Sequence, residues 1–138
     1  MSSQAEARPV NASTKFKAAV RARKTILFVN TRTAPLDLSR FCQTWRSLQS
    51  AGIAPQQALP DLADAFEPIS KPLATALDEV VPQLHQGASL TADFTPHKKV
   101  VGENFLAAVE LGERSGVLDI TLGHLTSFFR DVHMSRRN

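Results

Sequence analysis

Four histidines and a single cysteine are the side chains of this sequence that could transfer protons or attack a substrate near neutral pH. They are His85, His97, His124, His133 and Cys42. None stands in a catalytic pattern with its neighbours, and no glycine-rich phosphate loop or nucleophile elbow is present. The spacing of His124 and His133 places them on opposite sides of a helix, where they cannot share a metal ion. The sequence therefore predicts a protein that is not an enzyme and that holds no metal or other cofactor.

Positive charge is concentrated at the beginning of the chain. Residues 1–40 contain eight Lys and Arg residues against two acidic residues, whereas residues 41–138 contain eight against eleven. The densest cluster is Lys15, Lys17, Arg21, Arg23 and Lys24. This basic patch could bind an anionic membrane surface or an acidic protein partner, and it could equally be a solvated helix face. A nucleic-acid arm needs aromatic side chains among its cations, and Phe16 is the one candidate, so nucleic acid is not an expected partner.

The elements that must position these residues are helices. From Asp37 onward, apolar residues recur at helical spacing, and Asp37 is a candidate N-cap for the first helix. Gly52 stands at the left-handed position just past its end. The inner face of this first helix consists of Leu38, Phe41, Trp45 and Leu48. Cys42 lies one place from this stripe, so we expect it to be buried.

Five more helices are expected. The second opens at Pro55 and ends before Pro68, and Pro60 should bend or shorten it. The third lies between Ser70 and Gly87, with an irregular last turn at Pro82. The fourth is capped by Ser89 and runs through Phe94; the fifth and sixth are expected at about 100–111 and from near Val117 to the basic tail.

These elements predict an all-α fold, a compact antiparallel six-helix bundle at residues 37–134. A basic, partly disordered N-terminal arm and linker would occupy residues 1–36, with a short helix over residues 13–24. Residues 135–138 form a basic end. The sequence has no apolar run of about eighteen residues or more and no secretory signal, so we expect the chain itself to be soluble and cytosolic.

Three groups of turn residues carry a resemblance to a known family. They are Ala51-Gly52-Ile53 followed by Ala58-Leu59, then Gly87-Ala88-Ser89-Leu90, then Gly112-Glu113-Arg114-Ser115-Gly116-Val117-Leu118. In this order and spacing they resemble landmarks of the F-type inner-membrane platform proteins of type II secretion and type IV pilus systems. Physically they are structural turn and cap residues: Gly52 and Gly87 end helices, Ser89 starts one, and Gly112 and Gly116 let two long helices reverse tightly.

The resemblance implies a location and a set of partners. Family platforms usually carry two six-helix cytoplasmic bundles and about three membrane spans, and this chain looks like the first bundle, ending at a positive flank before the membrane. It would scaffold assembly at the cytoplasmic face of the bacterial inner membrane and couple the hexameric assembly ATPase to pilin movement. Other inner-membrane secretion or pilus subunits and a second copy of the chain, as a homodimer, are further expected partners.

Contact residues are expected at the corner between the last two helices. They are Glu110, Glu113 and Arg114, with the basic patch as a second contact surface. Glu113 could cap a backbone amide, bind a cation of a partner, or hold Ca²⁺. In the pair Phe128 and Phe129, one ring could face the core while the other is exposed as a contact surface.

One rival function remains open from the sequence alone. The chain could be a free-standing basic helical module that binds nucleic acid. DNA binding that falls steeply with salt would support that hypothesis.

Overall fold

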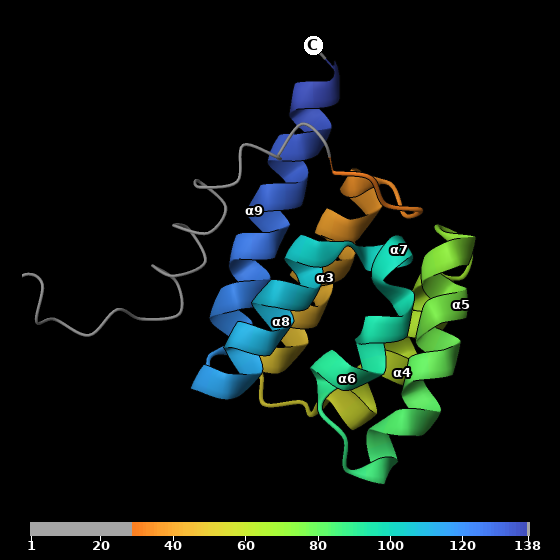
Figure 1. The fold of residues 1–138 in the computed structure, drawn as a ribbon, viewed down its shortest axis with the longest axis vertical. Coiled ribbons are helices and arrows are strands. Elements are labelled where there is room, and N and C mark those ends of the chain that lie inside the picture. The colour runs from red at the N-terminus through yellow and green to blue at the C-terminus, as the bar shows by residue number, and fades with distance from the viewer. Residues whose placement is uncertain (1–28, 138) are drawn as a thin grey trace, which may run out of the picture.

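The computed structural model describes residues 29–137, and every regular element in this range is a helix (Figure 1). The α-helices are α3 (Pro35–Ser50), α4 (Pro55–Phe66), α5 (Lys71–Val80), α6 (Leu90–Phe94), α7 (Lys98–Val101), α8 (Glu103–Ser115) and α9 (Leu118–Arg137). Two 3₁₀ helices, η2 (Val81–Gln86) and η3 (Thr95–His97), lie between them. The predicted all-α class is confirmed, and the six expected helices correspond to α3, α4, α5, α6, α8 and α9. The helix expected over residues 13–24 lies outside the described residues.

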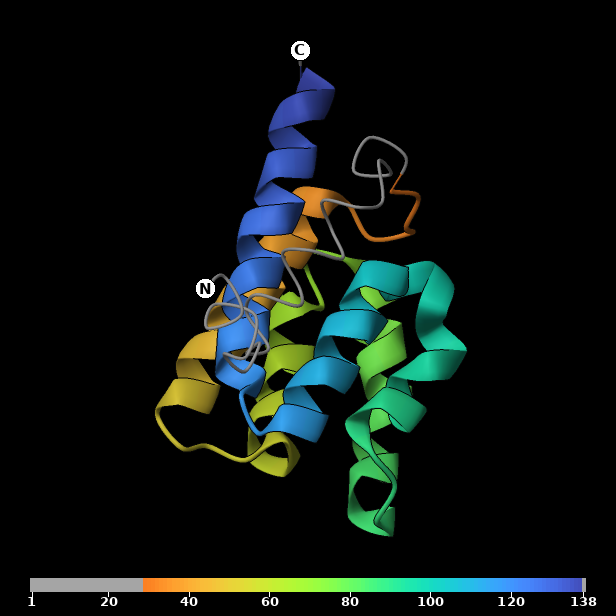
Figure 2. The ribbon, with the colours of Figure 1, turned by 60° about the vertical axis from the view of Figure 1, so that its left-hand side comes forward.

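The two longest helices, α3 and α9, lie side by side and run in opposite directions (Figure 1). Helix α8 packs against α9, and α4 packs against α5. The short helices α6 and α7 fill the space between α8 and α5, and Figure 2 shows the same arrangement from the side. The first turn of α6 therefore lies next to the last turn of α8.

An aromatic cluster forms the centre of the core. Its members are Phe41, Trp45, Phe66, Phe94 and Phe105, which come from α3, α4, α6 and α8. Phe41 meets Phe66 edge to face at 5.6 Å between ring centroids, and Phe94 meets Phe105 at 5.0 Å. Such pairs contribute about 0.5–1.5 kcal/mol each beyond the area that they bury. The apolar stripe predicted on α3 is thus the surface on which the other helices assemble, and Cys42 is buried beside it, as expected.

Helix α3 begins two residues earlier than its expected cap. Pro35 occupies the first turn, and Ala34 at the N-cap makes no side-chain hydrogen bond. The expectation that Asp37 is the N-cap is wrong: because proline is preorganised for the first helical position, the helix starts there and leaves Asp37 within its first turn. At the other end Gly52 has φ +83°, and the Ile53 N–H donates to the Leu48 carbonyl at 3.0 Å, as predicted for a glycine-terminated helix.

Proline affects α4 and α5 differently. Helix α4 continues through Pro60 to Phe66, so it is not shortened there; the buried Leu59 and Leu62 on both sides of the proline hold it against the core. After Val80 the chain tightens into the 3₁₀ helix η2, which contains Pro82, and it ends at Gly87 with φ +82°. The irregular last turn predicted at Pro82 is confirmed.

The expected fifth helix is interrupted. Gly102, with φ +92°, separates α7 from α8, so a continuous helix over 100–111 is wrong. A Cβ atom at Gly102 would lie 2.8 Å from the Cγ2 atom of Thr31. The linker before α3 therefore packs directly on this glycine, and both the backbone angle and the close approach require it.

The linker is tied to the bundle at two further points. The Arg32 N–H donates to the Lys99 carbonyl at 2.8 Å, and the Arg136 guanidinium donates to the carbonyl oxygen of Val29. Val29 itself is buried. These contacts hold the residues before α3 against α7 and against the last turn of α9.

Helix α9 differs from expectation in two respects. Phe128 and Phe129 are both buried, with ring centroids 5.3 Å apart, so the idea that one of them is exposed is wrong. The helix also continues through Arg137, so the basic end expected after residue 134 is its last turn.

Candidate functional site

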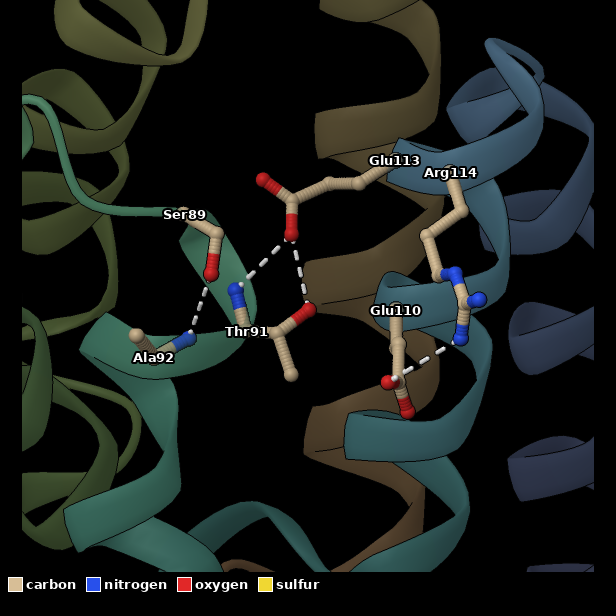
Figure 3. A network of polar contacts seen from close by, with 6 residues as sticks. All are labelled: Ser89, Thr91, Ala92, Glu110, Glu113 and Arg114. Carbon is tan, nitrogen blue, oxygen red and sulfur yellow. Dashed lines mark hydrogen bonds and ion pairs between the residues drawn. The ribbon is translucent and has the colours of Figure 1, made fainter.

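The three predicted contact residues of the last corner lie on the final turns of α8, facing α6 (Figure 3). Glu113 points across to the first turn of α6. Its Oε2 atom accepts a hydrogen bond from the Leu90 N–H at 2.6 Å, and its Oε1 atom accepts from the Thr91 N–H at 2.9 Å and the Thr91 hydroxyl at 2.7 Å. A carboxylate is thus placed at the positive end of a helix, where it is stabilised.

Ser89 completes the N-terminus of α6. Its hydroxyl oxygen accepts a hydrogen bond from the Ala92 N–H at 3.0 Å, as predicted for an N-cap serine. Together Ser89 and Glu113 satisfy three successive backbone N–H groups that have no partner within the helix. Because α6 has only five residues, its own hydrogen bonds cannot hold it, and these contacts with α8 supply the stabilisation.

Glu110 and Arg114 take no part in this network and are exposed to solvent. The Arg114 Nη1 atom lies 3.7 Å from the Glu110 Oε2 atom, and the side chains are 77% and 53% exposed respectively. An exposed pair of this kind contributes roughly 0–1 kcal/mol to stability. Both charges are therefore accessible to a partner at little cost to the fold.

A shallow depression of about 420 Å³ lies between α6 and α8 beside these residues. We call this surface the α6–α8 corner; it consists of Ser89, Thr91, Thr95, Glu110, Glu113 and Arg114. The predicted contact residues of α8 and the predicted cap Ser89 thus belong to one surface. Between residues 29 and 137, no group of three or more His, Cys, Asp or Glu side chains is arranged to hold a metal ion.

Asp93 lies behind the corner and was not singled out from the sequence. It is buried, its Oδ2 atom has no hydrogen-bond partner among the described residues, and burial raises its pKa, with the neighbouring Glu113 carboxylate as a second cause. Only the packing of α8 against α6 creates this environment. No pattern along the chain could have indicated it.

Gly112 and Gly116, near the end of α8, act in different ways. Gly116, with φ +72°, ends α8, and the Val117 N–H donates to the Gly112 carbonyl at 3.0 Å. Gly112 lies inside α8 instead of in the turn. A Cβ atom there would lie 2.5 Å from Thr121 Oγ1 and 2.8 Å from Leu118 Cα, so this glycine lets α9 pack closely against α8.

The remaining sequence candidates are separate from the corner. The basic patch of Lys15, Lys17, Arg21, Arg23 and Lys24 lies outside the described residues. The Nε2 atom of His97, at the end of η3, lies 3.7 Å from Glu79 Oε1. Burial raises the pKa of the Cys42 thiol.

Comparison with known proteins gives one match. A family model described as type II secretion system (T2SS), protein F, matches residues 41–138, which is most of the chain and includes the whole α6–α8 corner. No curated protein and no solved structure matches the chain significantly. Within the described range, no helix is long and apolar enough to cross a membrane.

Proposed function

Because this chain belongs to the type II secretion system protein F family, whose members are inner-membrane platform proteins of secretion and type IV pilus systems, we propose that it is a cytoplasmic assembly module of such a platform. In this role it performs no chemistry of its own. It scaffolds pilus or secretion assembly at the cytoplasmic face of the inner membrane and couples the assembly ATPase to pilin movement.

The observation that carries the proposal is the exposed ion pair of Glu110 and Arg114 on a rigid corner. Both residues lie on the last turns of α8, four positions apart, so this helix presents the two charges side by side, and the Glu113 contacts fix α8 against α6. A preorganised pair of opposite charges favours a partner with a complementary pair, because little side-chain and backbone freedom is lost on binding. The hexameric assembly ATPase is the partner that we propose for this surface.

A route from the corner to the rest of the fold supports the coupling role. Helix α8 joins α9 through the tight turn at Gly116, and α9 packs along α3 for most of its length. Displacement of α8 would therefore move α9 as a rigid element.

Other contacts of the proposed module involve the remaining inner-membrane subunits, a second copy of the chain, and the anionic membrane surface. For the homodimer, the exposed apolar side chains of Ile120 and Met134 on α9 are the candidates. Family membership gives no support to the rival nucleic-acid-binding function.

The test is calorimetric titration of the chain against the cytoplasmic assembly ATPase of the same system, at low and moderate salt. We expect saturable binding that Glu110→Lys or Arg114→Glu weakens at least about tenfold, since removing one partner of a charge pair in an interface costs about 2 kcal/mol or more. Asp131→Lys, an exposed reversal on α9, is the matched control and should bind as the wild type does. Glu113→Lys is unsuitable because it would also remove the cap of α6.

Two outcomes would contradict the proposal. Saturable binding that neither reversal weakens would place the ATPase contact on another surface of this chain. No binding at either salt concentration would remove the ATPase as a partner of this domain.

A further inference from the structure

A second surface, separate from the α6–α8 corner, is a cleft of about 770 Å³ between α5 and the η3–α7 segment. Its cationic side chains are Arg32, Lys71, Lys98 and Lys99, and His97 also lines it. They come from three separate parts of the chain: the linker, the start of α5, and η3–α7. We call it the α5–α7 cleft. Its volume is in the range of small-ligand sites, about 300–1,000 Å³.

The backbone fixes two of these cations relative to each other. The Arg32 N–H donates to the Lys99 carbonyl, and the Thr33 N–H donates to the Val100 carbonyl at 3.4 Å. The linker therefore runs along α7, and Arg32 and Lys99 line the same cleft from adjacent segments. Bringing them together requires the close contact of Thr31 with Gly102.

The cleft is positively charged, whereas residues 41–138 as a whole carry a net negative charge. Four permanent cations line it against one carboxylate, Glu79, although residues 41–138 carry more acidic than basic residues. Lys71 pairs with Glu67 at 2.8 Å and Lys98 pairs with Glu103 at 3.2 Å, and both acids lie outside the lining. Arg32 and Lys99 form no ion pair with any residue in 29–137. Two cations are thus left uncompensated side by side.

Two of the segments that line the cleft lie toward the end of the bundle where α9 finishes. In Figures 1 and 2 the linker and α7 lie toward the same end as the last turn of α9. That turn carries the exposed Arg136 and Arg137, and Arg136 contacts the carbonyl of Val29. One end of the molecule therefore collects the cations of the cleft and of α9.

We propose that the α5–α7 cleft binds a phosphate group, and that the source of this group is the headgroup of an anionic phospholipid. The Arg32 guanidinium can hold two phosphate oxygens and the Lys99 ammonium can neutralise the charge. The apolar lining residues Pro72, Ala76 and Pro96 suit the less polar part of a headgroup. The choice of a lipid source rests on the proposed function, which places the chain at a membrane surface; the phosphate site itself does not.

The experiment uses the full chain and vesicles of phosphatidylglycerol mixed with phosphatidylcholine, with pure phosphatidylcholine for comparison. Binding is measured by co-sedimentation for the wild type, for Arg32→Gln with Lys99→Gln, and for Arg40→Gln with Arg130→Gln. The second double variant removes the same charge from exposed positions outside the cleft. The basic patch of residues 15–24 is retained in all three proteins, so it does not affect the comparison.

We expect the cleft variant to bind anionic vesicles about twenty-five-fold more weakly, because each of the two cations near such a surface contributes about fivefold. The control variant should lose less than about twofold. Circular dichroism and Trp45 emission check that both variants are folded. A second arm adds inorganic phosphate to the labelled wild-type chain and follows the amide signals of Thr75 and Lys99 by NMR.

The two arms separate the outcomes. Vesicle binding that only the cleft variant loses supports a lipid headgroup as the ligand. Phosphate-induced NMR shifts in the absence of such vesicle binding support a phosphate site whose ligand comes from solution. The proposal is overturned if inorganic phosphate causes no shift and, in addition, either the two double variants lose vesicle binding equally or the wild type binds no vesicles. Binding to the assembly ATPase should be unchanged in the cleft variant, so failure here and failure of the proposed function are distinguishable.

Discussion

The Glu113 carboxylate accepts hydrogen bonds from both the backbone N–H and the hydroxyl of Thr91, which lies 22 residues earlier in the chain (Figure 3). The same carboxylate accepts a third bond from Leu90. One side chain therefore ties the last turn of α8 to the first turn of α6. The most exposed charges of the corner, Glu110 and Arg114, lie on the same turns of α8 but take no part in this contact.

Glu113→Ala should destabilise the fold by about 2 kcal/mol, because it leaves the first N–H groups of α6 without partners. Urea unfolding followed by Trp45 fluorescence measures the change in free energy. Glu110→Ala, which removes only the exposed ion pair, should cost less than about 0.5 kcal/mol. Equal effects of the two substitutions would contradict the capping role.

Gly112→Ala should destabilise the fold by about 1–2 kcal/mol. Alanine gains up to about 1 kcal/mol of helix propensity over glycine, but its Cβ atom would meet the backbone of Leu118 at 2.8 Å, and overpacking typically costs about 1–3 kcal/mol. α8 and α9 would have to separate. Thermal unfolding by circular dichroism gives the net value, and a stabilised variant would show that α9 does not need this close approach.

Gly87→Ala is the contrasting substitution, which introduces backbone strain without a close contact. It has φ +82° with nothing within 4 Å of a Cβ atom, so it should cost only about 1 kcal/mol through its left-handed conformation.

Asp93→Asn should stabilise the protein at neutral pH and lose this advantage in acid. Burial, with the Glu113 carboxylate as a second cause, raises the pKa of Asp93 in the folded state above the ordinary value of 3.8. Between these two pKa values the folded state binds more protons than the unfolded state, so wild-type stability falls as the pH rises through that window. Urea unfolding from pH 3 to pH 7.5 should give a difference between variant and wild type that grows with pH; a constant difference would contradict the assignment. Asp131→Asn, at an exposed site, is the control.

Cys42 should react with a thiol reagent only when the protein unfolds. It is fully buried in α3, and burial raises its pKa, so the native protein holds neither an accessible thiol nor a thiolate. Labelling in buffer should be at least about a thousandfold slower than in urea, because only the small unfolded fraction of the protein exposes the thiol in buffer. Cys42 is the only cysteine in the chain, so the measured labelling rate reports on this residue alone. Comparable rates in buffer and urea would mean that α3 opens locally.

Much of the fold could be predicted because its signals are local. The stripe of Phe41 and Trp45, the terminating Gly52 and the cap Ser89 each depend on residues within a few positions, and each is found as predicted. The break at Gly102 could not be predicted from its neighbours alone, because the close approach of Thr31 at this glycine comes from a segment 71 residues earlier in the chain.

The candidate site was predictable in its residues but not in their roles. The spacing placed Glu110, Glu113 and Arg114 on one corner, yet it left open whether Glu113 faces a partner or a backbone amide. Packing of α6 on α8 decides that it meets Thr91. The α5–α7 cleft was not predicted, because it needs the linker, α5 and α7 to meet in space.

The contact of Arg136 with Val29 has a mechanical consequence. The described bundle is entered and left at the same end, since α3 starts and α9 finishes there (Figure 1). A tensile load applied between residues 29 and 137 would first break this hydrogen bond and the backbone hydrogen bonds of Arg32 and Thr33 to α7, and would then open the α3–α9 interface turn by turn from that end. A load carried by α9 alone would instead shear that interface along its whole length, which resists far more force.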